Sequence, residues 1–442
     1  MRTPVLKSLP LLGSALDISK DIIRFMGRNF EHQKSFIFTL PMRTIFATCD
    51  ADVIQQILVS NHKNYRKDYA SNKLKMVLGN GLLTNEGESW FKQRRLAQPA
   101  FYKTRLEGFF DVMNRLAKNE MEEWKKQNKQ TVFIDAEMMQ LTSRVVVETL
   151  LGADVSGQLN QIQKHIYELQ LYMVKCIRNP FFEIWSALNG EKKRFEHSVQ
   201  SLDAILYHVI EQRKRQDAKN DLLSMLLDAR DLDTNEGMDT RQLRDELLTI
   251  YVAGHETSGY AISWAMYCLC SHPEKYKKAK AEVQQIMQDG ALTMERYRQF
   301  TYLKAVIDET LRLYPTAYML SRESKEEDVV NETDIPKGTV TLMSIYHLHR
   351  HPAYWTQPDE FIPERFEGKD NPLFNGSAYF PFGGGPRMCI GFYFATMEMT
   401  ILLAQLLYHF DFELDKNQKV EFEPLVTLKP KHGIKLNIRN VA

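Results

Sequence analysis

The sequence predicts a mainly helical fold with a small β-rich portion, and three observations support this prediction. Apolar residues recur at helical spacing, with charges between them, through most of the 442 residues. Short runs rich in β-branched and aromatic residues separate some of these stretches. One long apolar helix near the middle of the chain has to cross the core. The other helical segments are 106–125, 134–151, 159–176, 192–215 and one around Gln55.

The strand-like runs are 35–47, 339–345 and a weaker run at 431–439. We expect the β-rich portion to come mainly from residues 35–60, 315–350 and 420–440. The most linker-like stretches, 213–221 and 230–240, are polar and charged but not rich in Pro or Ser. Such composition favours long surface loops over domain boundaries. The expectation is therefore a single domain spanning residues 1–442.

The long central helix has clear start and stop signals. Asp239 and Gln242 have the spacing of a capping box, and His272-Pro273 ends the helical pattern. Between them lies a helix of about thirty residues, roughly 45 Å long. Its centre, residues 250–258, has almost no surface character yet carries a glycine and an acid.

Charge and cysteine content exclude several classes of function. Lys and Arg total 57 against 56 Asp and Glu, so the charge indicates neither a nucleic-acid partner nor a polybasic membrane surface. The 5 cysteines have no CxxC spacing, which argues against a disulfide framework or a structural zinc site and favours a reducing, cytoplasmic compartment. Residues 1–30 hold no apolar run long enough for a signal peptide or a transmembrane segment.

The segment 380–391 carries the strongest chemical signal. Its three consecutive glycines, followed by Pro386, exclude helix and strand and let the backbone turn tightly. A helical pattern starts just after Cys389, so this cysteine lies near a helix N-terminus, where backbone amides and the dipole favour a thiolate. A thiolate is a good metal ligand, and backbone donors moderate its charge.

The spacing Phe-x-x-Gly-x-Arg-x-Cys-x-Gly, from Phe382 to Gly391, resembles the cysteine-loop signature of the cytochrome P450 family. The resemblance implies a triangular fold in which haem b lies between the central helix and the cysteine-loop helix. It implies that Cys389 is the axial ligand of the haem iron, that Phe382 packs against the thiolate, and that Arg387 pairs with a haem propionate. Cysteine thiolate ligation favours O–O cleavage.

Three further patterns agree with this resemblance and extend it along the chain. Glu309 and Arg312, with Arg365 in the stretch Pro363-Glu364-Arg365-Phe366, match a buried charge network on the haem-proximal side. Trp90 and Arg94 lie one helical turn apart and place an indole and a guanidinium on one face, both suited to a propionate. Arg322 matches another position that binds a propionate in the family. The resemblance runs from 10–13 to 427–430.

The segment Ala253-Gly254-His255-Glu256-Thr257 matches the part of the central helix that passes over the haem. Gly254 is expected to permit the close approach to the cofactor, although a glycine inside a helix also serves close helix packing. The resemblance implies that Glu256 and Thr257 shape a local distortion and a proton path to bound oxygen. A threonine can bond a carbonyl one turn earlier and open a helix there.

The implied activity is that of a haem-thiolate monooxygenase acting on an organic small molecule. It uses O2 and two electrons from NAD(P)H, delivered by a ferredoxin or flavodoxin with its reductase. We expect a cytoplasmic monomer without a fused redox module. The cations Lys92, Arg95, Lys103 and Arg105 form a candidate docking face for an acidic electron donor.

Alternatives remain at the level of reaction and substrate. A peroxide-using peroxygenase of the same fold, a non-catalytic haem sensor and a cysteine hydrolase pairing Cys389 with His432 are the competing functions. Hydroxylation of an apolar molecule is the first expectation and O-demethylation of a methoxylated compound the second. The expected pocket-lining segments are 65–83, 167–177, 249–257, 316–320 and 426–427.

Overall fold

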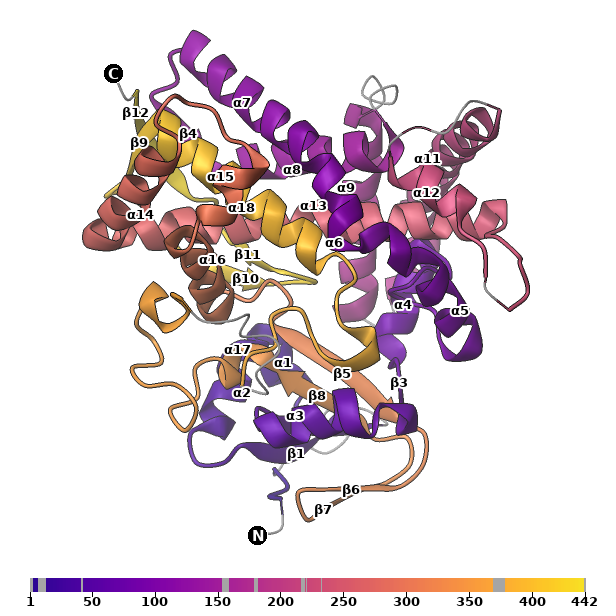
Figure 1. The fold of residues 1–442 in the computed structure, drawn as a ribbon. Helices are drawn as coiled ribbons and strands as arrows, with labels where there is room; N and C mark the ends of the chain where they lie inside the picture. The colour runs from indigo at the N-terminus through magenta and orange to yellow at the C-terminus, as the bar shows by residue number, and fades with distance from the viewer. Residues whose placement is uncertain are drawn as a thin grey trace.

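The computed structural model describes residues 3–6, 13–40, 43–152, 159–178, 182–215, 219, 221–231, 233–368 and 378–440. Residues 10–12, at the N-terminal end of the predicted resemblance, lie outside these ranges. Figure 1 shows a large helical part that contains the C-terminus and a smaller sheet-containing part that contains the N-terminus.

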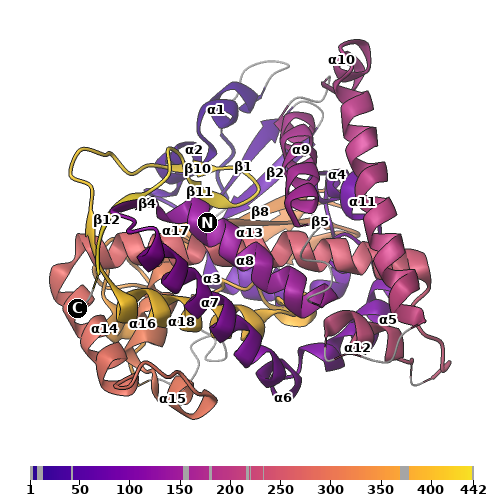
Figure 2. The ribbon, with the colours of Figure 1, turned by 90° about the horizontal axis from the view of Figure 1, so that it is seen from above.

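The helix α13 (Thr240–Ser271) crosses the whole helical part, as Figures 1 and 2 show. The side chain of Asp239 accepts a hydrogen bond from the backbone N–H of Gln242 at 2.7 Å, and the helix ends directly before His272-Pro273. The predicted bounds of this helix are confirmed. Its packing partners include α8 (Ile134–Leu151), α16 (Tyr302–Leu313) and α18 (Phe392–His409).

The other helices follow the amphipathic pattern of the sequence, and the four predicted ranges after residue 105 correspond to α7, α8, α9 and α11. Residues 103–109 form short α and 3₁₀ turns before α7 begins. These helices are α1 (Ala15–Lys20), α2 (Ile22–Phe30), α3 (Ala51–Gln55), α4 (Tyr69–Leu78), α5 (Gly87–Ala97), α6 (Lys103–Leu106), α7 (Phe110–Lys126), α9 (Leu159–Arg178), α10 (Phe182–Leu188), α11 (Glu191–Lys214), α12 (Leu222–Asp228), α14 (Pro273–Ile286), α15 (Met294–Gln299) and α17 (Ile345–Leu348).

The principal sheet has the order β1-β2-β8-β5-β3, with β2 and β8 parallel and the other neighbours antiparallel. Its strands are β1 (Ser35–Leu40), β2 (Arg43–Thr48), β3 (Tyr65–Arg66), β5 (Met319–Ser324) and β8 (Val340–Ser344). Within the range 35–60 the strands end at Thr48. Asp50 then caps α3 by accepting from the Asp52 N–H, and a π-helical turn (Gln56–Ser60) follows, because a capped start favours helix over strand.

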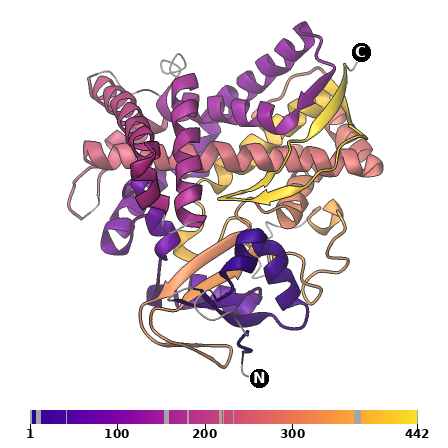
Figure 3. The same cartoon turned by 180° about the vertical axis from the view of Figure 1, so that it is seen from behind.

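Three smaller sheets lie around the helical core and the sheet edge. β4 (Thr131–Phe133), β12 (Lys435–Asn440) and β9 (Phe410–Leu414) form one, and β6 (Asp328–Val330) with β7 (Thr333–Ile335) forms another. The hairpin of β10 (Phe422–Pro424) and β11 (Leu428–Pro430) is the third. Figure 3 shows the yellow strands of this C-terminal region passing in front of α13 when the molecule is viewed from behind.

Two main hydrophobic cores meet at the segment that carries the predicted cysteine. The helical core includes α8, α13, α16 and α18, whereas the second core joins the principal sheet to α2 and α3. Phe380 belongs to the sheet core, while Phe382 and Ile390 pack on the helical core. The loop 380–391 therefore bridges the two cores and fixes Cys389 between them.

Candidate active site

The cysteine loop has the tight backbone that its glycines predict. Gly385 has a φ of +67°, and a Cβ there would lie 2.0 Å from the carbonyl oxygen of Leu58, so only glycine fits. The backbone N–H of Cys389 donates to the carbonyl of Phe382 at 2.9 Å, which closes the loop. The ring of Phe382 makes an edge-on contact with Phe392, the first residue of α18, with centroids 4.9 Å apart.

Cys389 is exposed, although it lies between the two cores and Phe392 nearby is buried. Although the thiol is accessible, the protein around it limits its hydration, and this desolvation raises its pKa. A hydrogen bond from the backbone N–H of Gly391 and the positive charge of Arg94 lower the pKa. The thiol is thus accessible, and it has the backbone donor and cation that stabilise a thiolate. A positive metal centre would complete the deprotonation of such a ligand.

Four cations gather beside the loop from separate parts of the chain: Lys67, Arg94, Arg322 and Arg387. Burial lowers the pKa of Lys67 to about 7, with further contributions from the charges of Arg322 and Arg387. Burial, followed by the charge of Arg387, lowers the pKa of Arg322 to about 10. Burial also lowers the pKa of Arg94 and of Arg387. Cations that destabilise one another in this way are poised for an anion.

The acids near this cluster are fewer than the cations. Glu86 pairs with Arg387 at 3.0 Å and accepts the backbone N–H of Lys67 at 2.9 Å. Asp68 is committed to capping α4, where it accepts from the backbone and hydroxyl of Ser71. The donor set, an accessible thiol with a surplus of partly buried cations, fits a metal-bearing cofactor with two carboxylates. It therefore fits haem.

Trp90 and Arg94 have other partners than those expected from the sequence. The indole N–H of Trp90 donates to the carbonyl of Leu82 at 3.1 Å, and the Arg387 guanidinium lies over its ring at 4.0 Å. An indole has one donor, and in this structure it bonds a backbone carbonyl; the expected contact of Trp90 with a propionate stays a prediction. The ring of Trp90 packs against the Arg387 guanidinium. Arg94 donates its Nε–H to Gln98 at 3.1 Å while its charge acts on Cys389.

The central helix places Gly254, Glu256 and Thr257 in three different environments. The hydroxyl of Thr257 donates to the carbonyl of Ala253 at 2.7 Å, the bond predicted for it. A Cβ on Gly254 would lie 3.2 Å from Val146 of α8, so this glycine permits close packing of α13 on α8, and its expected approach to haem stays a prediction. The carboxylate of Glu256 accepts hydrogen bonds from Gln170 and Thr427.

His255 lies within the expected pocket-lining segment 249–257. Its side chain is buried, its ring Nδ1 lies 2.8 Å from the carbonyl of Tyr251, and its ring is tilted against that of Tyr251 with centroids 4.6 Å apart. Its own carbonyl accepts from Thr142 of α8 at 2.8 Å. His255 therefore contributes to the α8–α13 contact.

The predicted charge network is present. Glu309 and Arg312 are fully buried, and the Nε–H and an Nη–H of Arg312 donate to the two oxygens of Glu309 at 2.7 and 2.8 Å. Arg365 joins from the side, with its Nε 3.3 Å from Glu309. Arg312 also donates to the backbone carbonyls of His349, Pro358 and Glu360.

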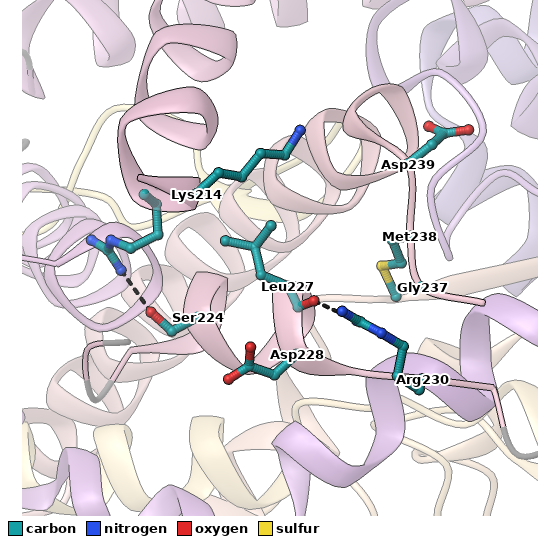
Figure 4. A pocket seen from close by; sticks show the side chains of 9 residues that line it. Lys214, Ser224, Leu227, Asp228, Arg230, Gly237, Met238 and Asp239 are labelled. Atoms are coloured by element: carbon teal, nitrogen blue, oxygen red, sulfur yellow. Dashed lines mark hydrogen bonds between the residues drawn. The ribbon is translucent and has the colours of Figure 1, made fainter. Parts of the chain in front are cut away.

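A cavity of about 530 Å³ lies where α11 and α12 meet the start of α13 (Figure 4). None of the residues predicted for the site lines it. Its lining includes Lys214, Asp228 and Arg230, and the Arg230 guanidinium donates to the carbonyl of Leu227.

Comparison with known proteins decides the family. The family model described as Cytochrome P450 matches residues 3–438. The chain belongs to the cytochrome P450 family. It is 30% identical to human "Cytochrome P450 4V2", with 99% of this chain and 89% of that protein covered. It is 29% identical to cyclooctatin synthase of Streptomyces melanosporofaciens, covering 90% and 87%. The crystal structure of the cytochrome P450DA heme domain superposes with a TM-score of 0.90 at 23% identity, covering 100% of this chain and 98% of that one.

As a P450 the protein is a monooxygenase that uses haem, O2 and reducing equivalents, with a small-molecule substrate and a redox partner. Within the described ranges, no helix is both long and apolar enough to cross a bilayer. Nor do the described residues contain a cluster of three or more His, Cys, Asp or Glu suited to an isolated metal ion.

Two residues near the cysteine loop of this P450 were not predicted as part of the cofactor site, although Lys67 lies within the expected pocket-lining segment 65–83. Lys67 joins the cation cluster, and Glu86 links Lys67 to Arg387. No local motif marks either residue, because their importance arises from the tertiary approach of a loop to the cysteine loop 302 residues further along the chain, where Arg387 also donates to the Asn85 carbonyl.

Proposed function

We propose that this P450 inserts one atom of O2 into an apolar organic small molecule, with haem b held by Cys389. The observation that carries the proposal is the accessible Cys389 thiol, flanked by the Gly391 N–H and Arg94, beside cations that lack sufficient acidic partners. We further propose that residues 1–442 act as one domain, as a cytoplasmic monomer.

Different residues of the chain would contact different parts of the cofactor. Cys389 ligates the iron, and Phe382 shields the thiolate from one side. Arg322, Arg387 and Lys67 neutralise the propionates, with Trp90 supporting Arg387 through its ring. When bound, haem supplies the activation of O2, while the protein provides orientation and electrostatics.

Glu256 and Thr257 are the proposed proton-handling pair. The Thr257 hydroxyl is anchored to the carbonyl of Ala253, so its oxygen remains an acceptor for a proton from solvent or from Glu256. Burial raises the pKa of Glu256, which brings a carboxyl closer to the range in which it exchanges protons at neutral pH. This acid–alcohol pair favours a monooxygenase over a peroxygenase.

The proposed substrate is apolar, with hydroxylation as the first reaction and O-demethylation as the second. Exposed Tyr167 and Leu171 on α9 and exposed Val426 before β11 supply apolar contact surface along expected pocket segments. The relatives include cytokinin hydroxylase of Arabidopsis thaliana, 30% identical over 92% of this chain and 81% of that protein. Hydroxylation at a methyl ether carbon would release formaldehyde, so product analysis separates the two reactions.

The proposed electron donor is a ferredoxin or flavodoxin that receives electrons from NAD(P)H through its reductase. α6 packs against α18, the helix that follows Cys389, and its Lys103 and Arg105 are exposed. No described carboxylate lies within ion-pair distance of either cation. They form a basic patch that suits an acidic partner.

Turnover with isotopically labelled O2 tests the proposal. The purified protein, a ferredoxin, its reductase and NADPH are incubated with compounds chosen by their spectral shift on binding. We expect one labelled oxygen atom in the product and NADPH consumption that depends on substrate. Label derived only from added peroxide would establish a peroxygenase, and haem binding without turnover of any compound that shifts the spectrum would favour a sensor.

A further inference from the structure

The carboxylate of Glu256 links three segments that are far apart in the sequence. Gln170 on α9 donates its side-chain N–H to one oxygen at 2.7 Å. Thr427, between β10 and β11, donates its hydroxyl to the other oxygen at 2.8 Å. Each carboxylate oxygen thus has a neutral donor from a different element. Figures 2 and 3 both show α9 and the β10–β11 hairpin on the same side of α13.

In these bonds a side chain reaches Glu256 from an element whose backbone packs mainly against parts of the chain other than α13. The backbone of α9 packs chiefly on α11 and α4, so Gln170 reaches α13 through the length of its side chain. Thr427 is buried, whereas Val426 beside it is exposed. On α9, Gln170 is half-buried and Leu171 beside it is exposed. Each donor therefore adjoins an exposed apolar side chain.

We propose that Gln170 and Thr427 are positioning residues that hold the Glu256 carboxylate between two walls of the substrate pocket, one formed by α9 and the other by the β10–β11 hairpin. The ability of Glu256 to transfer a proton then depends on the positions of these two elements. An apolar substrate touching Tyr167, Leu171 or Val426 shifts α9 or the hairpin and changes the two bonds. Proton delivery is thereby coupled to pocket occupancy. This inference rests on the proposed proton-handling role of Glu256.

The charges that face Glu256 are few. Lys429 on β11 acts on it and is itself paired with Glu423 on β10 at 3.3 Å. Tyr260 faces it from α13, and Asp135 of α8 and Tyr167 of α9 act in turn on that tyrosine.

The direction of the pH effect follows from these contacts. Burial raises the pKa of Glu256, while the bonds from Thr427 and Gln170 and the charge of Lys429 lower it. Loss of either donor therefore raises the pKa further, and the carboxylate becomes protonated at a higher pH. Any step that needs the ionised form then fails at a correspondingly higher pH.

Matched pairs of variants of the full-length holoprotein test the inference. Thr427→Val removes the hydroxyl with little change of shape, and Thr427→Ser retains it. Gln170→Met removes the donor, while Gln161→Met makes the same change at an exposed position of the same helix. Product formed per NADPH is measured against pH for each. For Thr427→Val and Gln170→Met, we expect the acid limb of this profile to move up by about one pH unit, with Thr427→Ser and Gln161→Met following the parent.

Hydrogen–deuterium exchange on the substrate-free protein gives a second readout that does not depend on turnover. Thr427→Val should increase exchange in α9, on the far side of Glu256 from the substitution, and Thr427→Ser should not. Both readouts are required. An unmoved acid limb in Thr427→Val and Gln170→Met, or unchanged exchange of α9 in Thr427→Val, overturns the inference.

Glu256→Gln separates failure of this inference from failure of the proposed function. If Glu256→Gln forms as much product per NADPH as the parent, the proton-handling role is wrong and the inference fails with it. If Glu256→Gln is uncoupled while Thr427→Val and Gln170→Met match the parent, only the positioning role fails.

Discussion

Arg312 and Glu309 form a fully buried, two-bond ion pair, with donor–acceptor distances of 2.7 and 2.8 Å. Such a pair holds its surroundings only while both members are present, because a single buried charge is strongly unfavourable. The remaining donors of Arg312 bind backbone carbonyls of the segment that precedes Arg365. The pair therefore anchors residues 358–360, which belong to the segment that leads to the cysteine loop.

Replacing Glu309 by alanine should leave Arg312 unpaired in the core. We expect a loss of about 3–5 kcal/mol in the free energy of unfolding, with poor haem retention, measured by denaturant titration and by the haem absorbance of purified protein. Glu364→Ala is the matched control, since Glu364 pairs near the surface with Lys275, and should cost at most about 1 kcal/mol. Equal stability of the two variants would refute the structural role of the pair.

Arg365→Ala should cost less than Glu309→Ala. Arg365 is partly exposed and makes one contact of 3.3 Å with Glu309, which keeps both bonds from Arg312. A decrease of about 1–2 kcal/mol is expected from the lost hydrogen bonds, measured by the same titration. A loss as large as that of Glu309→Ala would mean that Arg312 alone does not compensate the buried carboxylate.

Thr257→Ala should retain the fold and the haem but lose the coupling of electrons to product. The variant removes the hydroxyl that donates to Ala253 and can relay a proton, so reducing equivalents should appear as peroxide. Thr257→Ser keeps the hydroxyl and should restore coupling. The measurement is product and peroxide formed per NADPH, and full coupling of Thr257→Ala would reject the role given to this hydroxyl.

Two of the four cations proposed to dock the electron donor are already paired within the chain. Lys92 pairs with Glu236, and Arg95 pairs with Asp231 and Asp233. These two cations therefore hold the loop before α13 against α5. The double variant Lys103→Glu/Arg105→Glu should therefore slow reduction by an acidic ferredoxin and weaken its salt dependence.

Substrate binding by the Lys103/Arg105 double variant, measured without the partner, should equal that of the parent. The sign-matched control is Lys193→Glu, at an exposed position of α11. Parent-like reduction rates at low salt in the double variant would exclude α6 from the docking face.

Lys67→Met should weaken haem retention by about tenfold, roughly 1.4 kcal/mol, because one charge-assisted contact to a propionate is lost. The rate of haem transfer to a haem-scavenging protein measures this. Lys63→Met, an exposed lysine nearby, is the control. The same transfer rate for both variants would remove Lys67 from the cofactor site.

Much of the fold could be predicted from local signals. Asp239 with Gln242 and His272-Pro273 marked the ends of α13 because caps and stops depend on neighbouring residues. The network of Glu309, Arg312 and Arg365 could be predicted only from the resemblance to the family, because Glu and Arg three residues apart also form ordinary surface pairs.

The remaining contacts could not be predicted, because they form only when separate segments meet in the folded chain. The indole of Trp90 bonds the Leu82 carbonyl and its ring packs against Arg387, and Gly254 packs close to Val146. These partners come from outside the helices that carry Trp90 and Gly254. The partners of Glu256 come from segments 86 residues before and 171 residues after it. No periodicity or spacing in the sequence indicates which distant segments will be in contact.

The absorbance of the reduced protein under carbon monoxide tests whether Cys389 ligates the haem iron, since the band position depends on the protein ligand. We expect the strongly red-shifted Soret band of thiolate ligation in the parent and in Cys270→Ser, which replaces a half-buried thiol bonded to a backbone carbonyl. Cys389→Ser should lose this band. A red-shifted band that persists unchanged in Cys389→Ser, or is missing from the haem-loaded parent, would contradict the assignment of Cys389 as the iron ligand.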